Sequence, residues 1–239
     1  MSTPDLSVVV NFHQERLNAY PTLRCINAAA VYATQMSINL ELFYILDNSD
    51  FETTRLVTTY NSNAAIHASI VRISEGDLGA ARNHGARIAN GTVLAFCDGD
   101  DLYSRNWFSV GYHTVSQTSA LIVAHPEYVV NFGMHRSYAR QTDLTTKRSY
   151  SGLLIDNWWC SWTIARREIY IGVPYSRNEI ATSGFGFEDW HWNCEVLSRG
   201  MSHVLAPRTA GYYRRSSSGL LSQSLRNSRL LRPTALFMK

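Results

Sequence analysis

Short apolar runs alternate with amphipathic stretches along the first half of the chain. Apolar runs rich in β-branched residues predict buried strands at residues 6–12, 41–46, 69–73 and 92–97. Helices are predicted between them, over residues 15–33 and 76–90; the second has Asp77 at its N-cap position and Gly91 just beyond its end. Strands and helices that alternate at this spacing indicate βαβ units and a mostly parallel sheet.

The pattern in the second half is less regular. Extended segments are predicted at residues 120–124, 128–132 and 158–164. Pro126 is expected to separate the first two, because proline cannot donate to a strand ladder. The polar residues 135–150 are predicted as a mobile loop.

Two helices are predicted towards the end of the chain, a short one at 166–171 and a longer one at 188–199. In the longer helix the apolar positions recur at helical spacing, at Trp190, Cys194, Leu197 and Met201. A glycine-containing segment at 183–187 is expected to be a flexible approach to this helix.

The composition fits one folded domain. The 239 residues are 45% apolar and carry a net charge of only +3, which excludes intrinsic disorder for most of the chain. We expect a single domain with a first half to about residue 118, a second half over about 119–222, and a basic tail at 223–239. The four cysteines form no Cys-x-x-Cys pair, and no basic leader begins the chain, so a cytoplasmic location is expected.

Charge is distributed unevenly. Residues 1–120 contain 7 arginines and 11 acids, whereas residues 121–239 contain 15 basic residues and 8 acids. No acid follows Glu195. A basic run of this kind is usually a solvated tail, but it also suits an anionic membrane surface. The sequence therefore predicts a peripheral contact with the inner face of the membrane through Arg226, Arg229 and Arg232.

Polar side chains stand where three of the predicted strands end, at Asn11, Asp47 and Asp98. Ligands of parallel sheets bind outside the carboxyl ends of the strands. The third strand end continues as Asp98-Gly99-Asp100-Asp101, whose carboxylates repel one another unless a cation or amide donors compensate them. Magnesium and manganese bind through one or two carboxylates together with substrate phosphates. An ordinary acidic turn is the alternative for this segment.

Three further groups carry candidate chemistry. Glu188 and Asp189 fall in the first turn of a predicted helix, where an acid stays ionised and can accept a proton, although simple capping is the alternative. Arg214, within a Tyr-Tyr-Arg-Arg-Ser segment, suits a diphosphate or forms a solvated strand end. Five of the six tryptophans lie within 35 residues; most are expected in the core, and Trp158 and Trp190 are candidates for a sugar platform.

Common phosphate and hydrolase motifs are absent from the sequence. No Gly-x-x-x-x-Gly-Lys loop occurs, and no Gly-x-Gly-x-x-Gly follows the first strand. His-Glu-x-x-His and Gly-x-Ser-x-Gly are also missing.

Six motifs in this order resemble those of a family 2 glycosyltransferase with the GT-A fold, over about residues 6–222: residues 11–15, 46–49, 79–85, 98–101, 186–190 and 213–215. The resemblance implies an inverting transfer from a nucleotide diphosphate sugar to a hydroxyl acceptor, such as a glycan or lipid-linked sugar in polysaccharide biosynthesis. It also implies dependence on Mn²⁺ or Mg²⁺, and a single catalytic domain whose nucleotide-binding half ends at about residue 118 and whose acceptor half covers about 119–222.

The resemblance assigns roles to individual residues. Asn11, Phe12 and Glu15 match the loop that meets the nucleoside. Asp47 matches the acid that bonds the base, and Arg82 matches a segment near the nucleotide. Asp98 and Asp100 match the Asp-x-Asp motif that holds donor and metal, with Asp100 on the metal. Asp189 matches the catalytic base, and Glu188 is expected to orient the acceptor.

The sequence departs from the family pattern at two places. Residues 11–15 read Asn-Phe-His-Gln-Glu where the family usually has Pro-Thr-Tyr-Asn-Glu, and Ser216 stands where a histidine is common. A non-catalytic module that binds nucleotide sugars or polyanions is the alternative function, although such a module needs neither Asp100 nor Asp189. A nucleotidyltransferase is disfavoured, because the loop after the first strand contains no glycine.

Overall fold

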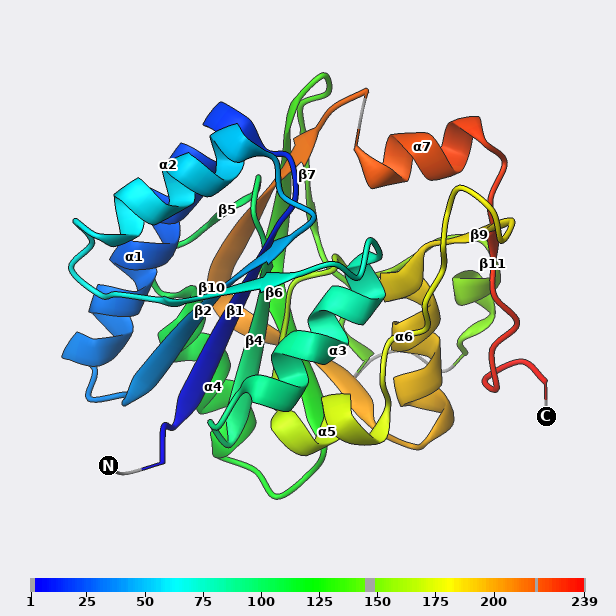
Figure 1. The fold of residues 1–239 in the computed structure, drawn as a ribbon. Coiled ribbons are helices and arrows are strands. Elements are labelled where there is room, and N and C mark those ends of the chain that lie inside the picture. The colour runs from blue at the N-terminus through cyan, green and yellow to red at the C-terminus, as the bar shows by residue number, and fades with distance from the viewer. Residues whose placement is uncertain (1–2, 145–148, 218, 239) are drawn as a thin grey trace.

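A computed structural model describes residues 3–144, 149–217 and 219–238. A curved central sheet crosses the whole molecule (Figure 1). Its nine strands run in the order β3-β2-β1-β4-β8-β6-β10-β5, with β7 beside β6. The strands are β1 (Leu6–Phe12), β2 (Leu40–Asp47), β3 (Ser69–Ile73), β4 (Val93–Asp98), β5 (Leu102–Tyr103), β6 (Ile122–Gly133), β7 (Ser137–Arg140), β8 (Thr163–Arg166) and β10 (Ser202–Arg215). The first four are parallel to one another, and β8 is antiparallel to both of its neighbours.

Helices cover both faces of this sheet. The helices α1 (Ala19–Gln35), α2 (Phe51–Asn61) and α4 (Trp107–Ser116) pack with one core cluster, whereas α3 (Leu78–Ile88), α5 (Arg167–Gly172) and α6 (Glu188–Ser198) pack with the other. Val8 and Val10 point into the first cluster and Val9 into the second. Because both faces of β1 are buried, its sequence is a continuous apolar run. The predicted mostly parallel α/β fold is confirmed.

The first half matches its predicted elements closely. β1 and β3 have the predicted bounds, and the helix expected at 15–33 begins as a short 3₁₀ turn, Arg16–Asn18, before α1. The Asp77 side chain caps α3 by accepting a hydrogen bond from the Ala80 N–H at 2.9 Å. Three elements of this half, α2, β5 and α4, have no counterpart among the predicted elements.

Two predictions for the second half are wrong. Pro126 does not separate two strands, because β6 runs continuously past it. The neighbouring strand β10 shifts register between Ala206 and Ala210, so the missing proline N–H falls at a bulge. The expected loop at 135–150 contains β7, which pairs with β6; residues 145–148 of that loop lie outside the described part of the chain.

The last part of the chain returns to the body of the molecule. The helix α7 (Leu220–Arg226) is followed by β11 (Leu230–Leu231), which pairs in parallel with β9 (Phe185–Gly186) just before α6. The segment expected to be a flexible approach to α6 is therefore held by a second strand. Phe187, between β9 and α6, has a left-handed backbone with φ of 59°.

The basic tail also differs from its prediction. Arg229 donates to the Ala181 carbonyl at 3.2 Å, and the Arg232 Nε donates to Asn178 at 3.0 Å. These two arginines bind the protein itself, while Arg226 is exposed. Within the described residues, no helix is both long and apolar enough to cross a membrane. The division into halves near residue 118 stays a prediction, since one sheet runs through both.

Candidate active site

The carboxyl ends of β1, β2 and β4 bring the three predicted polar strand ends to one edge of the sheet. Asn11 and Asp98 are partners in the β1–β4 register. The chain turns sharply after Asp98, and a Cβ atom on Gly99 would lie 2.5 Å from the Phe12 ring and 2.7 Å from the Asn11 carbonyl oxygen. Only glycine fits this turn, which directs the following carboxylates away from the strand.

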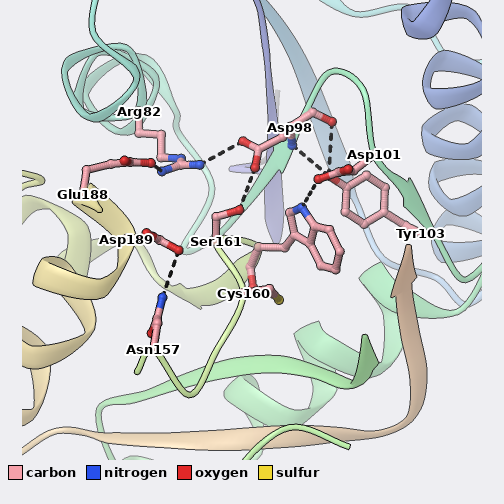
Figure 2. Close-up of polar contacts among 10 residues, drawn as sticks. Arg82, Asp98, Asp101, Tyr103, Asn157, Cys160, Ser161, Glu188 and Asp189 are labelled. Atoms are coloured by element: carbon pink, nitrogen blue, oxygen red, sulfur yellow. Dashed lines mark hydrogen bonds and ion pairs between the residues drawn. The ribbon is translucent and has the colours of Figure 1, made fainter. Parts of the chain in front are cut away.

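Arg82 joins this strand end to the start of α6. Its side chain is fully buried, and its guanidinium donates to Asp98 Oδ1 and to Glu188 Oε1, both at 2.9 Å (Figure 2). Burial disfavours the charged guanidinium, but the two carboxylates outweigh burial and hold the pKa of Arg82 well above its usual value. The guanidinium also lies 5.3 Å from the centre of the Tyr175 ring.

Asp98 has a protein partner on each oxygen. Oδ1 accepts from Arg82, and Oδ2 accepts from the Ser161 hydroxyl at 2.6 Å. The Asp98 N–H donates to the Tyr103 hydroxyl at 2.7 Å, which fixes the backbone of the strand end. The position of Asp98 is therefore determined without any ligand.

Asp101 is a buried anchor of the same turn. Its Oδ1 accepts from the Arg214 N–H at 2.7 Å and its Oδ2 accepts from the Trp162 indole at 2.9 Å. These bonds connect the turn to β10 and to the segment before β8. Burial, with the charges of Asp100 and Asp98, raises the pKa of Asp101 well above its usual value.

Asp100 is the carboxylate of this turn that no side chain engages among the described residues. Its backbone carbonyl accepts from Arg214 Nε at 2.9 Å, so the main chain is fixed while the carboxylate stays available to a ligand. Burial and the nearby Asp98 raise the pKa of Asp100 to about 6.

Asp189 lies across from the strand end, at the start of α6 (Figure 2). Its Oδ2 accepts from the Asn157 amide at 3.0 Å. Burial and the adjacent Glu188 raise the pKa of Asp189 to about 7, although Arg82 acts in the opposite direction. Burial and the charge of Glu188 thus act against the helix dipole, which by itself favours the ionised form.

Residues 7–171 match the family model described as Glycosyl transferase family 2. The match spans most of the chain and includes the strand ends that carry Asn11, Asp47 and Asp98. The chain belongs to this family. The predicted family resemblance is thereby confirmed.

Solved structures similar to this family 2 chain share its fold. Staphylococcus aureus TarS 1–349 superposes with a TM-score of 0.64 at 16% identity, covering 88% of this chain and 60% of that one. A mannosyltransferase from Pyrobaculum calidifontis, solved in complex with GDP-Man and Mn²⁺, gives 0.65 at 12% identity, covering 95% and 62%. TarS has also been solved with UDP and with UDP-GlcNAc. The chain spans about three fifths of these neighbours, and no curated protein matches it.

The predicted nucleoside residues of the family 2 chain have different environments. Asn11 is 6% exposed, and neither its amide oxygen nor its nitrogen has a partner among the described residues. Asp47 accepts from the N–H groups of Glu75 and Gly76 through Oδ1. Glu15 lines an open cavity of about 360 Å³, and burial raises its pKa to about 8.

Two residues predicted to touch the nucleotide sugar do not offer their side chains to a ligand. The Phe12 ring is 1% exposed and packs edge-on against Tyr44, because the strand that carries it is buried on both faces. Arg82 is fully buried behind Asp98 and Glu188. Glu188 is correspondingly bound to Arg82 through Oε1, and its contact with the acceptor stays a prediction.

The predicted platform tryptophans lie on the α6 side. The Trp190 indole donates to the Leu153 carbonyl at 2.9 Å, and Trp158 packs edge-on against Trp159. Both are only partly buried, whereas Trp159, Trp162 and Trp192 are in the core as expected. Arg214 lies 4.7 Å from the centre of the Phe132 ring.

The donor set fits a divalent cation at Asp100 better than at Asp98. Both Asp98 oxygens already accept hydrogen bonds, whereas the Asp100 carboxylate has a raised pKa and no side-chain donor. The described residues contain no cluster of three or more His, Cys, Asp or Glu able to hold a metal alone. A site completed by substrate phosphates needs only one or two carboxylates.

Sequence reasoning missed the polar residues of the segment before β8. Ser161 binds Asp98, and Asn157 binds Asp189, so this segment touches both acidic groups (Figure 2). The only indication of Asn157 and Ser161 in the sequence is that both are polar within a tryptophan-rich stretch, Asn157-Trp158-Trp159-Cys160-Ser161-Trp162.

Proposed function

We propose that this chain transfers a sugar from a nucleotide diphosphate sugar to a hydroxyl acceptor, with inversion at the anomeric carbon. The family membership supports glycosyl transfer. The observation that carries the proposal is the pairing by Arg82 of one carboxylate from β4 and one from α6. This ion pair joins the strand end that carries Asp100 to the helix start that carries Asp189, and neither of these two acids forms an ion pair among the described residues.

Asp189 acts as the general base of a single displacement. The acceptor hydroxyl oxygen forms a bond to the anomeric carbon as its proton passes to the Asp189 carboxylate. The bond from that carbon to the phosphate oxygen breaks on the opposite face, and its electron pair leaves with the nucleoside diphosphate. A pKa of about 7 suits this task, since an effective base has a pKa near the working pH.

Asp100 would hold the divalent cation, Mn²⁺ or Mg²⁺. When bound, the cation compensates the charge that develops on the leaving diphosphate. Asp98, whose carboxylate is held in place by Arg82 and Ser161, would then contact the donor sugar nucleotide. Arg214 fixes the backbone of Asp100 and adds positive charge beside the diphosphate.

The nucleoside and the acceptor take opposite sides of the site. Asn11, Asp47 and Glu15 offer polar atoms at the ends of β1 and β2, where the unpartnered amide of Asn11 favours a ligand contact. Trp158 and Trp190 provide flat apolar surface beside Asp189 for a glycan or lipid-linked sugar.

The test uses the purified protein with UDP-GlcNAc or GDP-mannose, each with Mn²⁺. We expect a nucleoside diphosphate to raise the melting temperature by several degrees, and more in the presence of the metal. A candidate acceptor should then stimulate release of the nucleoside diphosphate. Binding without any transfer across a glycan acceptor panel would favour the non-catalytic module instead.

A cytoplasmic location with peripheral contact to an anionic membrane belongs to the same proposal. Arg226 is exposed on α7 next to Leu225, which is 64% exposed, whereas Arg229 and Arg232 bind the protein. Basic residues near an anionic surface each contribute about 1 kcal/mol, so the attraction of Arg226 alone is weak. Co-sedimentation with phosphatidylglycerol vesicles should fall in Arg226→Glu; equal binding to neutral vesicles would refute the contact.

A further inference from the structure

Asn157 is the side chain that connects the proposed base to the rest of the fold. Its Nδ2 donates to Asp189 Oδ2 at 3.0 Å, and its Oδ1 accepts from Asn193 Nδ2 at 3.2 Å. Asp189 and Asn193 are one turn apart on α6, so they lie on the same face of the helix. Asn157 bridges this turn from the segment before β8.

The orientation of the Asn157 amide follows from its partners. The Trp159 backbone N–H, which can only donate, faces Oδ1 at 3.4 Å. With Oδ1 directed at this donor, the NH₂ group must face Asp189. The hydrogen-bond network thus decides which end of the amide meets the carboxylate.

Asn193 is itself anchored in the core. The residue is 1% exposed, and its backbone carbonyl oxygen accepts from His203 Nε2 at 3.2 Å. The buried His203 ring stacks on Trp159 with centroids 4.2 Å apart. The contact between Asn157 and Asp189 therefore rests on well-packed groups.

We infer that Asn157 is a positioning residue that holds Asp189 Oδ2 and leaves Oδ1 as the atom that receives the proton of the acceptor. No other side chain of the described residues donates a hydrogen bond to this carboxylate; the Trp190 backbone N–H also acts on it and is retained when Asn157 is changed. The inference rests on the proposed function, in which Asp189 is the base. It assigns Asn157 no contact with substrate.

Several charged and titratable groups face Asp189 from the neighbouring elements: Glu188 on α6, Arg82 on α3, Asp98 on β4, Cys160 before β8, Tyr175 after α5 and Tyr213 on β10. All of these groups are retained when Asn157 alone is changed. A change in the titration of Asp189 in that variant is then due to the lost amide donor.

The first test needs no substrate. The side-chain carboxyl signals of aspartate, labelled with ¹³C, are titrated by NMR, and the signal absent from Asp189→Asn identifies Asp189. In Asn157→Ala we expect the midpoint to rise by about one pH unit, because a hydrogen bond to the charged form is lost. An unchanged midpoint would overturn the inference.

Asn61→Ala is the matched control. Asn61 also uses both ends of its amide, donating to the Ala68 carbonyl at 2.9 Å and accepting from the Ala68 N–H at 2.7 Å, at the end of α2. Its loss should lower stability without moving the midpoint. If Asn157→Ala fails to fold, Asn193→Ala is used instead, because it removes one hydrogen-bond partner of Asn157. We then expect a smaller rise in the titration midpoint of Asp189. An unchanged midpoint in this variant would count against the inference.

The second test is a double-mutant cycle on nucleoside diphosphate release from UDP-GlcNAc or GDP-mannose with Mn²⁺. Asn157→Ala should lower kcat by about tenfold with little change in the KM for the donor, and should cost nothing further in the Asp189→Asn background. An equal loss in both backgrounds would overturn the positioning role. Full turnover by Asp189→Asn would refute the proposed function instead, and the NMR titration would still decide whether Asn157 holds Asp189.

Discussion

The end of β4 presents three acids and the start of α6 two, and Arg82 pairs with one acid of each. At β4 the paired acid is Asp98 and Asp101 is bound by Arg214 and Trp162, which leaves Asp100; at α6 the paired acid is Glu188, which leaves Asp189. Burial raises the pKa of both remaining acids, to about 6 and about 7. The same arrangement thus appears twice, built on different elements.

The two remaining acids differ in what surrounds them. Asp100 follows a tight turn, its carbonyl is fixed by Arg214, and the charge of Asp98 disfavours its ionised form, so a cation would stabilise it. Asp189 accepts from a neutral amide and lies beside tryptophans, which favours a proton. In the proposed function, a single buried arginine therefore supports a metal-binding acid on one side and a proton-accepting acid on the other.

Removing the α6 acid should have the largest effect. We expect Asp189→Asn to lower kcat by about 10²–10⁴-fold while binding of UDP or GDP with Mn²⁺ changes little. The parent rate should fall as the pH drops below about 7, since protonation abolishes the base. Turnover measured alongside calorimetry checks both statements, with the exposed acid Glu168 changed to Gln as control; weak nucleotide binding would move Asp189 to the donor side.

Replacing Arg82 should destabilise both the end of β4 and the start of α6. Arg82→Met leaves Asp98 and Glu188 buried without their partner, which typically costs about 3–5 kcal/mol of unfolding free energy. Urea unfolding measures this loss. Arg140→Met, which breaks an exposed pair with Glu127, is the control and should change little. Adding Glu188→Gln to Arg82→Met should restore part of the stability, and no restoration would mean that the charge is not the cause.

Replacing Asp100 should distinguish metal-dependent from metal-independent binding of the nucleotide. Asp100→Asn should weaken Mn²⁺-dependent binding of UDP or GDP by about tenfold or more, while the protein melts normally. Binding in excess EDTA should be equal in variant and parent. If Asp100→Asn binds the metal complex as tightly as the parent, the cation is held elsewhere and the comparison between the two acids fails.

The smallest effect concerns stability rather than rate. The pKa of Asp189 is raised in the folded protein, so the stability it contributes is complete below about pH 4 and is lost as the pH rises through about 7. Asparagine does not titrate. We therefore expect Asp189→Asn to melt a few degrees above the parent at pH 8, with the difference gone at pH 4. A variant less stable than the parent at pH 8 contradicts this.

Local pattern was enough for the parallel strands and too weak for other elements. β1 has the predicted bounds because it is an apolar run buried on both faces, and the partly exposed β3 has them because its β-branched residues favour a strand. The helix α2 escaped prediction because it buries only Thr53 and Val57, so its apolar face is weak. The role of Pro126 depends on a bulge in another strand some 80 residues later, which no local signal reveals.

The candidate site shows the same limit. The acids were found because they cluster in the sequence, at 98–101 and 188–189. The partner of Arg82 on α6 lies 106 residues away, so its burial between two carboxylates could not be deduced from its own segment. Asn157 and Ser161 are single polar residues among tryptophans, and only the fold places them against the acids.

The pairing of β11 with β9 has a consequence for how the protein is made. Chains fold from the N-terminus as they leave the ribosome, so β1 to β4 can form their sheet while α6 is still being translated. The strand that holds the approach to Asp189 emerges later than the helix it steadies. The nascent protein can therefore form the sheet edge at Asp98 before the strand that steadies the start of α6 has been made.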